Sequence, residues 1–269
     1  VGSTDAVVDF IGFQEPYLQD TLESLTIEAG GRKSFTTRHY IFISTDSVYW
    51  AQKFSCLDAR LPEEAARDFS PQEFDTHLDY CKLTSLGEYQ LRYGGNKLGC
   101  ERVLQEAWEA DGFPYTILRL PDVYGPYDNL GGFWELLQAI EMRRPIPVHL
   151  QNGRIRPREG QNPEDPANRR FSWVFAEDVR DAILACLSKG AEVQGLSMHI
   201  AHEEAVNLRE TAVMIADAMS IRATALRFDE QRNAALPSTD FGALDVSKSL
   251  RLLRPWRPTA MRAAVGRAV

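Results

Sequence analysis

The chain has 269 residues, of which 44% are hydrophobic and 25% are charged, as in ordinary soluble globular proteins. No apolar run approaches the ~18 residues that a membrane-spanning helix needs, so the sequence argues against a membrane-embedded protein. The net charge of −8 argues against a general affinity for nucleic acid.

Cysteine and histidine positions predict neither a disulfide framework nor a metal site. The four cysteines are scattered along the chain, and the histidines show no metal-ligand spacing. We therefore expect free thiols in a reducing compartment. The chain opens on Val1 with an interior strand pattern and without a signal peptide, which favours a cytoplasmic location unless a targeting segment precedes it.

Strands and helices are predicted to alternate along the chain. Runs of bulky and β-branched residues predict β-strands at 6–10, 40–44, 115–120 and 196–201. Apolar residues at helical spacing predict α-helices at 16–29, 94–112, 131–144, 177–190 and 207–219. We expect Gly30 and Gly31 to close the first helix, and Asn207 with Glu210 to cap the last. The alternation indicates an α/β fold with a mostly parallel, doubly wound sheet.

Four small polar residues follow the strand at 40–44 and overlap its end: Ser44, Thr45, Asp46 and Ser47. A turn needs suitable backbone conformations, but it does not need two hydroxyls, a carboxylate and a third hydroxyl in succession. Ligands of open α/β sheets sit just outside the carboxyl ends of the strands. The pattern therefore predicts a binding or catalytic edge here, although a plain polar turn remains open at this point.

Tyr93 and Lys97 lie four residues apart at the predicted start of the helix at 94–112, so their side chains share one face. A phenol has a pKa near ~10, too high for a base at neutral pH, and a neighbouring ammonium lowers it. The pair can thus form a general acid/base. By itself the spacing is a weak signal that occurs often by chance, and it fits a surface tyrosine beside a solvated lysine better.

These segments occur in one order: a strand with STDSVY, then YGGNK, PYTILRLPDVYGP and FSWVFAEDVRDAI, with DVSKSLRLLRPWRPT near the end. The succession resembles the extended short-chain dehydrogenase/reductase family, which contains NAD-dependent epimerases and dehydratases of sugar nucleotides. The likeness covers nearly the whole chain. It implies a Rossmann-type nucleotide-binding part at 1–128, continued by 171–204, and a substrate-binding region formed by 129–170 and 205–269.

The resemblance also implies roles for single residues. Tyr93 would be the catalytic acid/base, Lys97 would bind the nicotinamide ribose and lower the pKa of Tyr93, and Thr45 would bind the substrate oxygen that is oxidised. The other cofactor contacts would be Ser44, Pro121 and Val123. The other substrate contacts would be Asp46, Ser47 and Arg170, the last of these on a phosphate group.

The sequence departs from the family at its beginning. The glycine-rich turn that binds the cofactor pyrophosphate is absent, and so is the residue that would choose between NAD and NADP. The strand at 6–10 corresponds to the family's fourth strand. We therefore expect a partial sheet that lacks its first strands, in a truncated chain whose binding of NAD or NADP and whose activity are in doubt.

The resemblance implies an NAD(P)-dependent epimerase or reductase that acts on a sugar nucleotide or a similar polyol, without a metal and with a homodimer as its possible assembly. Family dehydratases carry Thr-Asp-Glu at the strand tip, whereas this chain has Ser47 at the third position. Epimerisation or carbonyl reduction is therefore expected rather than dehydration. The alternative is a non-catalytic protein on the same scaffold, which binds RNA or acts as a regulatory subunit.

Overall fold

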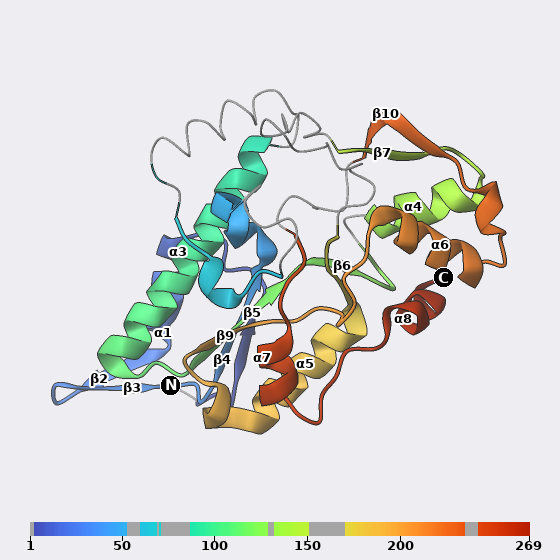
Figure 1. Ribbon diagram of the computed structural model, residues 1–269. Helices are drawn as coiled ribbons and strands as arrows, with labels where there is room; N and C mark the ends of the chain where they lie inside the picture. Colours follow the sequence, from blue (N-terminus) through green and yellow to red (C-terminus); the bar gives the residue numbers. More distant parts are fainter. Residues whose placement is uncertain are drawn as a thin grey trace.

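The computed structural model describes residues 3–52, 60–68, 70, 87–128, 132–150, 170–234 and 242–269. Its centre is a four-stranded sheet with parallel neighbours in the order β1, β4, β5, β9 (Figure 1). These strands are β1 (Val7–Asp9), β4 (Tyr40–Thr45), β5 (Tyr115–Leu120) and β9 (Leu196–His199). Every residue of β4 and β5 is buried, which explains why both strands are continuous apolar runs with little alternation.

Helices cover both faces of this sheet (Figure 1). One side carries α1 (Glu15–Ser24) and α3 (Gly87–Asp111), and the other carries α5 (Ala176–Lys189) and α7 (Ser247–Leu252). Successive residues of β4 alternate between the two faces: Phe42 packs in a cluster with Leu104 of α3, and Ile41 in a cluster with Val179 of α5. This confirms the predicted α/β fold with a parallel, doubly wound sheet.

A β-hairpin replaces the last part of the helix predicted at 16–29. Helix α1 ends at Ser24, and the chain then forms the antiparallel strands β2 (Thr26–Ala29) and β3 (Arg32–Phe35). Gly30 and Gly31 both have positive φ angles, 60° and 74°, as a tight two-residue hairpin turn requires. The prediction was wrong because Gly-Gly is a turn signal for a hairpin as well as a stop signal for a helix.

Helix α3 begins seven residues earlier than predicted, at Gly87 rather than at position 94. Tyr93 therefore lies in its second turn and not at its start. The predicted helix at 131–144 is shorter than expected, because α4 (Gly132–Glu141) ends before Arg143, whose φ angle is 53°. The predicted cap of the helix at 207–219 is confirmed: Asn207 and Glu210 form a reciprocal capping box at the start of α6 (Leu208–Ala218).

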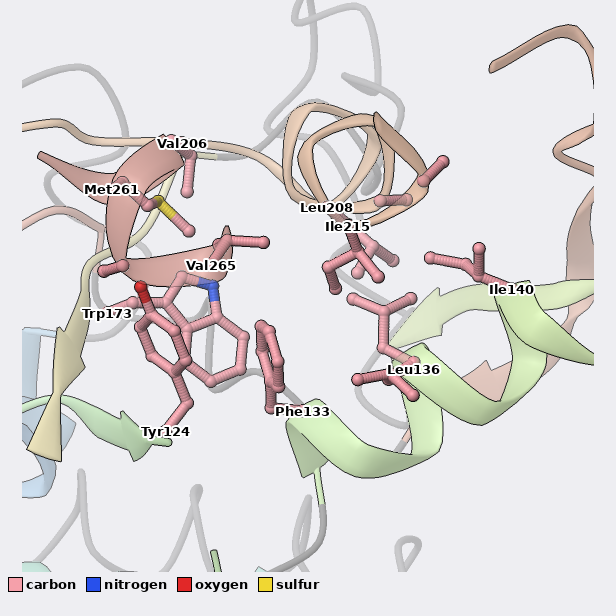
Figure 2. Close-up of a cluster of buried hydrophobic side chains, with 14 of the residues drawn as sticks. Tyr124, Phe133, Leu136, Ile140, Trp173, Val206, Leu208, Ile215, Met261 and Val265 are labelled. Atoms are coloured by element: carbon pink, nitrogen blue, oxygen red, sulfur yellow. The ribbon is translucent and has the colours of Figure 1, made fainter. Parts of the chain in front are cut away.

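A second hydrophobic core lies beside the sheet, between α4, α6 and α8 (Met261–Ala268) (Figure 1). Figure 2 shows the rings of Tyr124, Phe133 and Trp173 together with apolar side chains from these helices, and the Tyr124 and Phe133 rings stack with centroids 4.6 Å apart. Two further pairs of parallel strands flank this core: β6 (Asp122–Tyr124) with β8 (Trp173–Phe175), and β7 (Ile146–Leu150) with β10 (Phe228–Ala234).

Short 3-10 helices complete the described structure: η1 (Asp46–Gln52), η2 (Glu63–Ala65), η4 (Gly190–Val193) and η5 (Ala223–Ala225). Within the described ranges, no helix has the length and apolar character that crossing a membrane requires. Cys100 and Cys186 are buried free thiols, and burial raises their pKa values to about 11 and about 12. The other two cysteines lie outside the described residues.

Candidate active site

Ser44 and Thr45 end β4 at the carboxyl edge of the sheet, as predicted, and both are buried. The Ser44 hydroxyl donates to Glu101 Oε1 at 2.5 Å. Thr45 Oγ1 accepts the backbone N–H of Ser47 at 3.2 Å, and the two hydroxyl oxygens are also 3.2 Å apart. The hydroxyls of the strand tip are thus held by neighbours, and the chain passes directly from Thr45 into η1, which packs against α3.

Lys97 is almost completely buried near this tip, with 1% of its surface exposed. Its ammonium donates to the carbonyl oxygen of Ile43 at 2.8 Å and lies over the rings of Phe42 and Phe13, 4.5 and 4.8 Å from their centroids. Burial lowers the pKa of Lys97 from 10.5 to about 8, partly offset by the negative charge of Asp9. A lysine in such surroundings releases its proton closer to neutral pH than an exposed lysine does.

Tyr93 lies one helical turn before Lys97 on the same face of α3 and is half-buried. Its ring meets that of Phe13, with centroids 6.0 Å apart. Phe13 therefore contacts both members of the predicted catalytic pair. It comes from the segment after β1, in a position that no sequence signal marked.

A turn built around Asp9 fixes the segment that carries Phe13. Asp9 Oδ1 accepts the backbone N–H groups of Ile11 and Gly12, each at 2.8 Å, and Asp9 Oδ2 accepts the hydroxyl of Tyr40. A Cβ atom added at Gly12 would lie 2.7 Å from Asp9 Oδ2 and 2.8 Å from the Phe42 ring. The close approach of this backbone to β4 thus requires glycine at position 12.

An ion pair between Glu101 and Arg119 lies below the strand tip. Their side chains are 0% and 4% exposed, and the guanidinium reaches the carboxylate through Nη2 at 2.6 Å and Nε at 3.0 Å. Arg119 Nη1 also donates to the hydroxyl of Tyr49 at 2.7 Å and to the carbonyl of Glu63 at 2.6 Å. The pair is therefore fully engaged in hydrogen bonds, as a buried ion pair must be.

The hydrogen-bond chain continues from Tyr49 to His199 at the end of β9. His199 Nδ1 lies 2.7 Å from the carbonyl oxygen of Asp245, which can only accept, so Nδ1 carries the proton. His199 Nε2 must then accept the hydroxyl of Tyr49, 2.5 Å away. Burial lowers the pKa of His199 to about 3, which keeps the imidazole neutral.

Asp46, directly after the strand tip, has a pKa well above the usual value, because desolvation of its carboxyl group and the negative charge of nearby Asp122 disfavour its charged form. Asp122 begins β6, which follows β5 after a single residue. The negative charges of Asp46 and Asp122 therefore repel each other beside Thr45. Among the described residues, no group of three His, Cys, Asp or Glu side chains is placed to hold a metal ion.

The structure brings Ser44, Thr45 and Lys97 together and places Tyr93 on the same helix face. Pro121 is buried directly after β5, and Val123 is half-buried in β6 opposite Val174. The proposed contacts of these residues with cofactor or substrate stay predictions.

The described contacts of Arg170 are not with the tip of β4. It is exposed, donates to the carbonyl of Ala205 and pairs with Glu210 at the start of α6 at 3.0 Å. Its contact with a substrate phosphate also stays a prediction.

Sequence reasoning missed Glu101 and Arg119, although each carried a signal. Arg119 interrupts the apolar strand YTILRL, and a charge in a buried strand requires a partner. Glu101 follows Lys97 by four residues and therefore shares its helix face. Phe13, Tyr49 and His199 carried no such signal.

Comparison with known proteins identifies the family of the chain. The sequence profile described as "NAD dependent epimerase/dehydratase family" matches residues 27–201, more than half of the chain. A curated relative, dTDP-L-rhamnose 4-epimerase from Burkholderia thailandensis, is 30% identical over 174 residues, which cover 62% of this chain and 41% of the relative. The chain thus spans less than half the length of that protein.

Solved structures share the fold. UDP-glucuronic acid 4-epimerase from Bacillus cereus, in complex with NAD, is 18% identical with a TM-score of 0.59, over 87% of this chain and 60% of that one. A dTDP-glucose 4,6-dehydratase from Bacillus anthracis is 15% identical with a TM-score of 0.63, over 98% of this chain and 71% of that one. On the profile match and the fold together, the chain belongs to the NAD-dependent epimerase/dehydratase family.

Proposed function

We propose that this chain carries the catalytic edge of an NAD(P)-dependent epimerase or reductase that acts on a sugar nucleotide or a similar polyol. The observation that carries the proposal is the buried ammonium of Lys97, which lies on the carboxyl end of β4 with Tyr93 one turn before it. Burying an unpaired ammonium costs free energy, so a purely structural site would favour an apolar residue.

The residues at this edge fit the nicotinamide end of the cofactor. In the described part of the chain, the carbonyl of Ile43 is the one hydrogen-bond acceptor of the Lys97 ammonium, whose remaining N–H bonds face aromatic rings. We expect the ammonium to bind ribose hydroxyls when the cofactor occupies this edge. NAD(P), when bound, would accept a hydride from the substrate carbon and return it.

Each residue then has a distinct task. The ammonium of Lys97 favours the phenolate form of Tyr93, so that this phenol can take the proton of a substrate hydroxyl near neutral pH. The hydroxyl of Thr45 binds the same substrate oxygen and fixes its position. Phe13 lies against both residues of the pair and shields the ammonium of Lys97 from water.

Epimerisation or reduction is preferred over dehydration, because Ser47 replaces the glutamate that dehydratases of this family carry at the strand tip. A hydroxyl cannot serve as the base that removes a proton beside a carbonyl. Detection of a 4-keto-6-deoxy product would overturn this preference. It would direct attention to Asp122, whose charge raises the pKa of Asp46.

The test uses the natural protein that contains these residues. It is incubated with NAD and either UDP-glucuronic acid or dTDP-L-rhamnose, the substrates named for its relatives, and the configuration at sugar C4 is followed by proton NMR. Tyr93→Phe should remove most turnover, whereas Tyr17→Phe, the same change at an exposed site, should leave it intact. Equal turnover in the two variants would contradict the proposed role of Tyr93.

A further inference from the structure

The ion pair of Glu101 and Arg119 holds both ends of the predicted catalytic segment. Ser44, just before Thr45, donates to the carboxylate of Glu101 at 2.5 Å. Tyr49, which follows the strand tip in η1, accepts from the guanidinium of Arg119 at 2.7 Å. The three residues 45–47, with their two hydroxyls and one carboxyl, therefore lie between two anchors on a single ion pair.

The same pair ties α3 to the sheet beside the catalytic residues. Lys97 and Glu101 are one turn apart on α3 and bond to consecutive residues of β4, the carbonyl of Ile43 and the hydroxyl of Ser44. Arg119 lies directly opposite Ser44 in the parallel register of β4 and β5. A shift of α3 along the strand would break both bonds together.

Stability alone does not explain such a pair. Removing two charges from water costs free energy that their attraction repays only when geometry is good, and apolar residues of similar size often serve equally well. Nη1 of Arg119, which does not bond to Glu101, donates to the hydroxyl of Tyr49 and to the carbonyl of Glu63 at the same edge of the sheet. The arrangement thus fixes positions at the strand tip at a cost to the stability of the fold.

We propose that Glu101 and Arg119 are positioning residues, which hold α3 and the segment 45–47 so that Tyr93 and Lys97 face Thr45. The inference rests on the proposed function, because it assigns the pair a part in the same reaction. Neither residue takes up or releases a proton in this role. Both act through the residues that they hold.

The test compares the single variants Glu101→Met and Arg119→Met with the double variant. Each single variant leaves one buried charge without its partner and should lower the thermal midpoint by about 10 °C. The double variant removes both charges and should regain most of that loss. Thr116→Val is the matched control, because it removes a buried hydroxyl at the other end of β5, where it contacts His39 and Val193.

Two readouts separate positioning from a purely structural role. The first is turnover: the double variant should stay roughly a hundredfold slower than the parent with a KM within about threefold, because small displacements of reacting groups cost about that much. The control should keep its turnover. Recovery of turnover together with the thermal midpoint in the double variant would overturn the proposal.

The second readout needs no substrate and therefore survives failure of the proposed function. The chain has six lysines, so the titration of Lys97 can be followed by NMR of 13Cε-labelled lysine and assigned with Lys97→Met. The negative charge of Glu101 raises the pKa of Lys97, so its loss alone would lower the midpoint. Release of α3 would instead hydrate the ammonium and raise the midpoint above about 8. A midpoint that stays or falls in Glu101→Met, where only the negative charge is lost, would contradict positioning.

Discussion

Replacing Lys97 by methionine should make the fold more stable at pH 7, although it removes a residue that the proposed reaction needs. Lys97 is 1% exposed, and its burial lowers its pKa from 10.5 to about 8. That difference corresponds to a cost of about 3 kcal/mol for keeping the side chain charged in the folded state. A methionine of similar length does not carry this cost.

The gain is smaller than the cost, because the variant also loses the hydrogen bond to the carbonyl of Ile43. A hydrogen bond from a charged donor contributes about 2 kcal/mol, and a thioether against the rings of Phe13 and Phe42 restores part of the aromatic contact. The net gain is therefore about 1 kcal/mol, a rise of roughly 3 °C in Tm for a chain of this size.

The stability difference between the parent and Lys97→Met should depend on pH in a direction set by the pKa shift of Lys97. The pKa of Lys97 in the folded state lies below that in the unfolded state, so the unfolded parent binds more protons between pH 8 and 10.5. Stability of the parent relative to the variant must then rise with pH across this window. The advantage of Lys97→Met, about 1 kcal/mol at pH 7, should vanish within about one pH unit above 8 and reverse by pH 10, where the parent becomes the more stable protein.

Urea unfolding of the parent and of Lys97→Met at pH 7 and pH 10 measures the effect. Lys33→Met is the control: Lys33 is exposed and pairs with Asp111 at 2.6 Å, which raises its pKa, so its removal should give no gain at pH 7. A Lys97→Met variant that is less stable than the parent at pH 7 would refute the reasoning. So would an advantage that is the same at both pH values.

Three further expectations concern the same edge. Tyr93→Phe and Lys97→Met should each remove most turnover, and the double variant should be little worse than either, because the two act as a unit; multiplicative losses would contradict this. Gly12→Ala should lower the free energy of unfolding by about 1–3 kcal/mol in urea titrations, because its methyl group meets Asp9 and Phe42, and unchanged stability would show that the turn can relax. These 269 residues alone should show no saturable rise in Tm at micromolar NAD or NADP, and such a rise would reveal a phosphate site outside the expected glycine-rich turn.

The helix α1 does not supply a substitute for that turn. Free backbone N–H groups at a helix N-terminus attract phosphate, but α1 begins with Glu15, whose carboxylate opposes an anion there. Glu15 also pairs with Arg102 on α3 at 3.3 Å. The Glu15 carboxylate at this helix start is one physical reason to expect weak binding of the pyrophosphate by this chain.

The central strands were predictable from sequence because they are buried on both faces. β4 and β5 are short continuous apolar runs, and each ends where small or polar residues begin. The hairpin at 26–35 was not predictable in the same way, since Leu25 and Ala29 continue the helical spacing of Leu18 and Leu22 in α1. The early start of α3 was not predicted, because Gly94 and Gly95 have low helix propensity. The packing of Leu98 and Leu104 into the core stabilises the helix in spite of them.

The candidate site was predictable only where its residues are close in sequence. Thr45 lies within a polar run, and Tyr93 with Lys97 has helical spacing, so both could be seen without a structure. The pairing of Arg119 with its partners could not be predicted, because Glu101 precedes it by 18 residues and Tyr49 by 70. Their meeting depends on the order of strands in the sheet, which brings β5 between β4 and β9.

The two ends of the central sheet differ in a way that supports a functional reading of the carboxyl edge. At the amino end, the buried polar contact is neutral, between His39 and Thr116, and burial lowers the pKa of His39 so that it stays uncharged. At the carboxyl end, Lys97, Glu101 and Arg119 are all ionisable and almost completely buried. A fold selected for stability alone would have no reason to place three such groups at one edge, since each costs free energy on leaving water. Their concentration around Thr45 is what a site needs when it must hold charge in a fixed geometry before the substrate arrives.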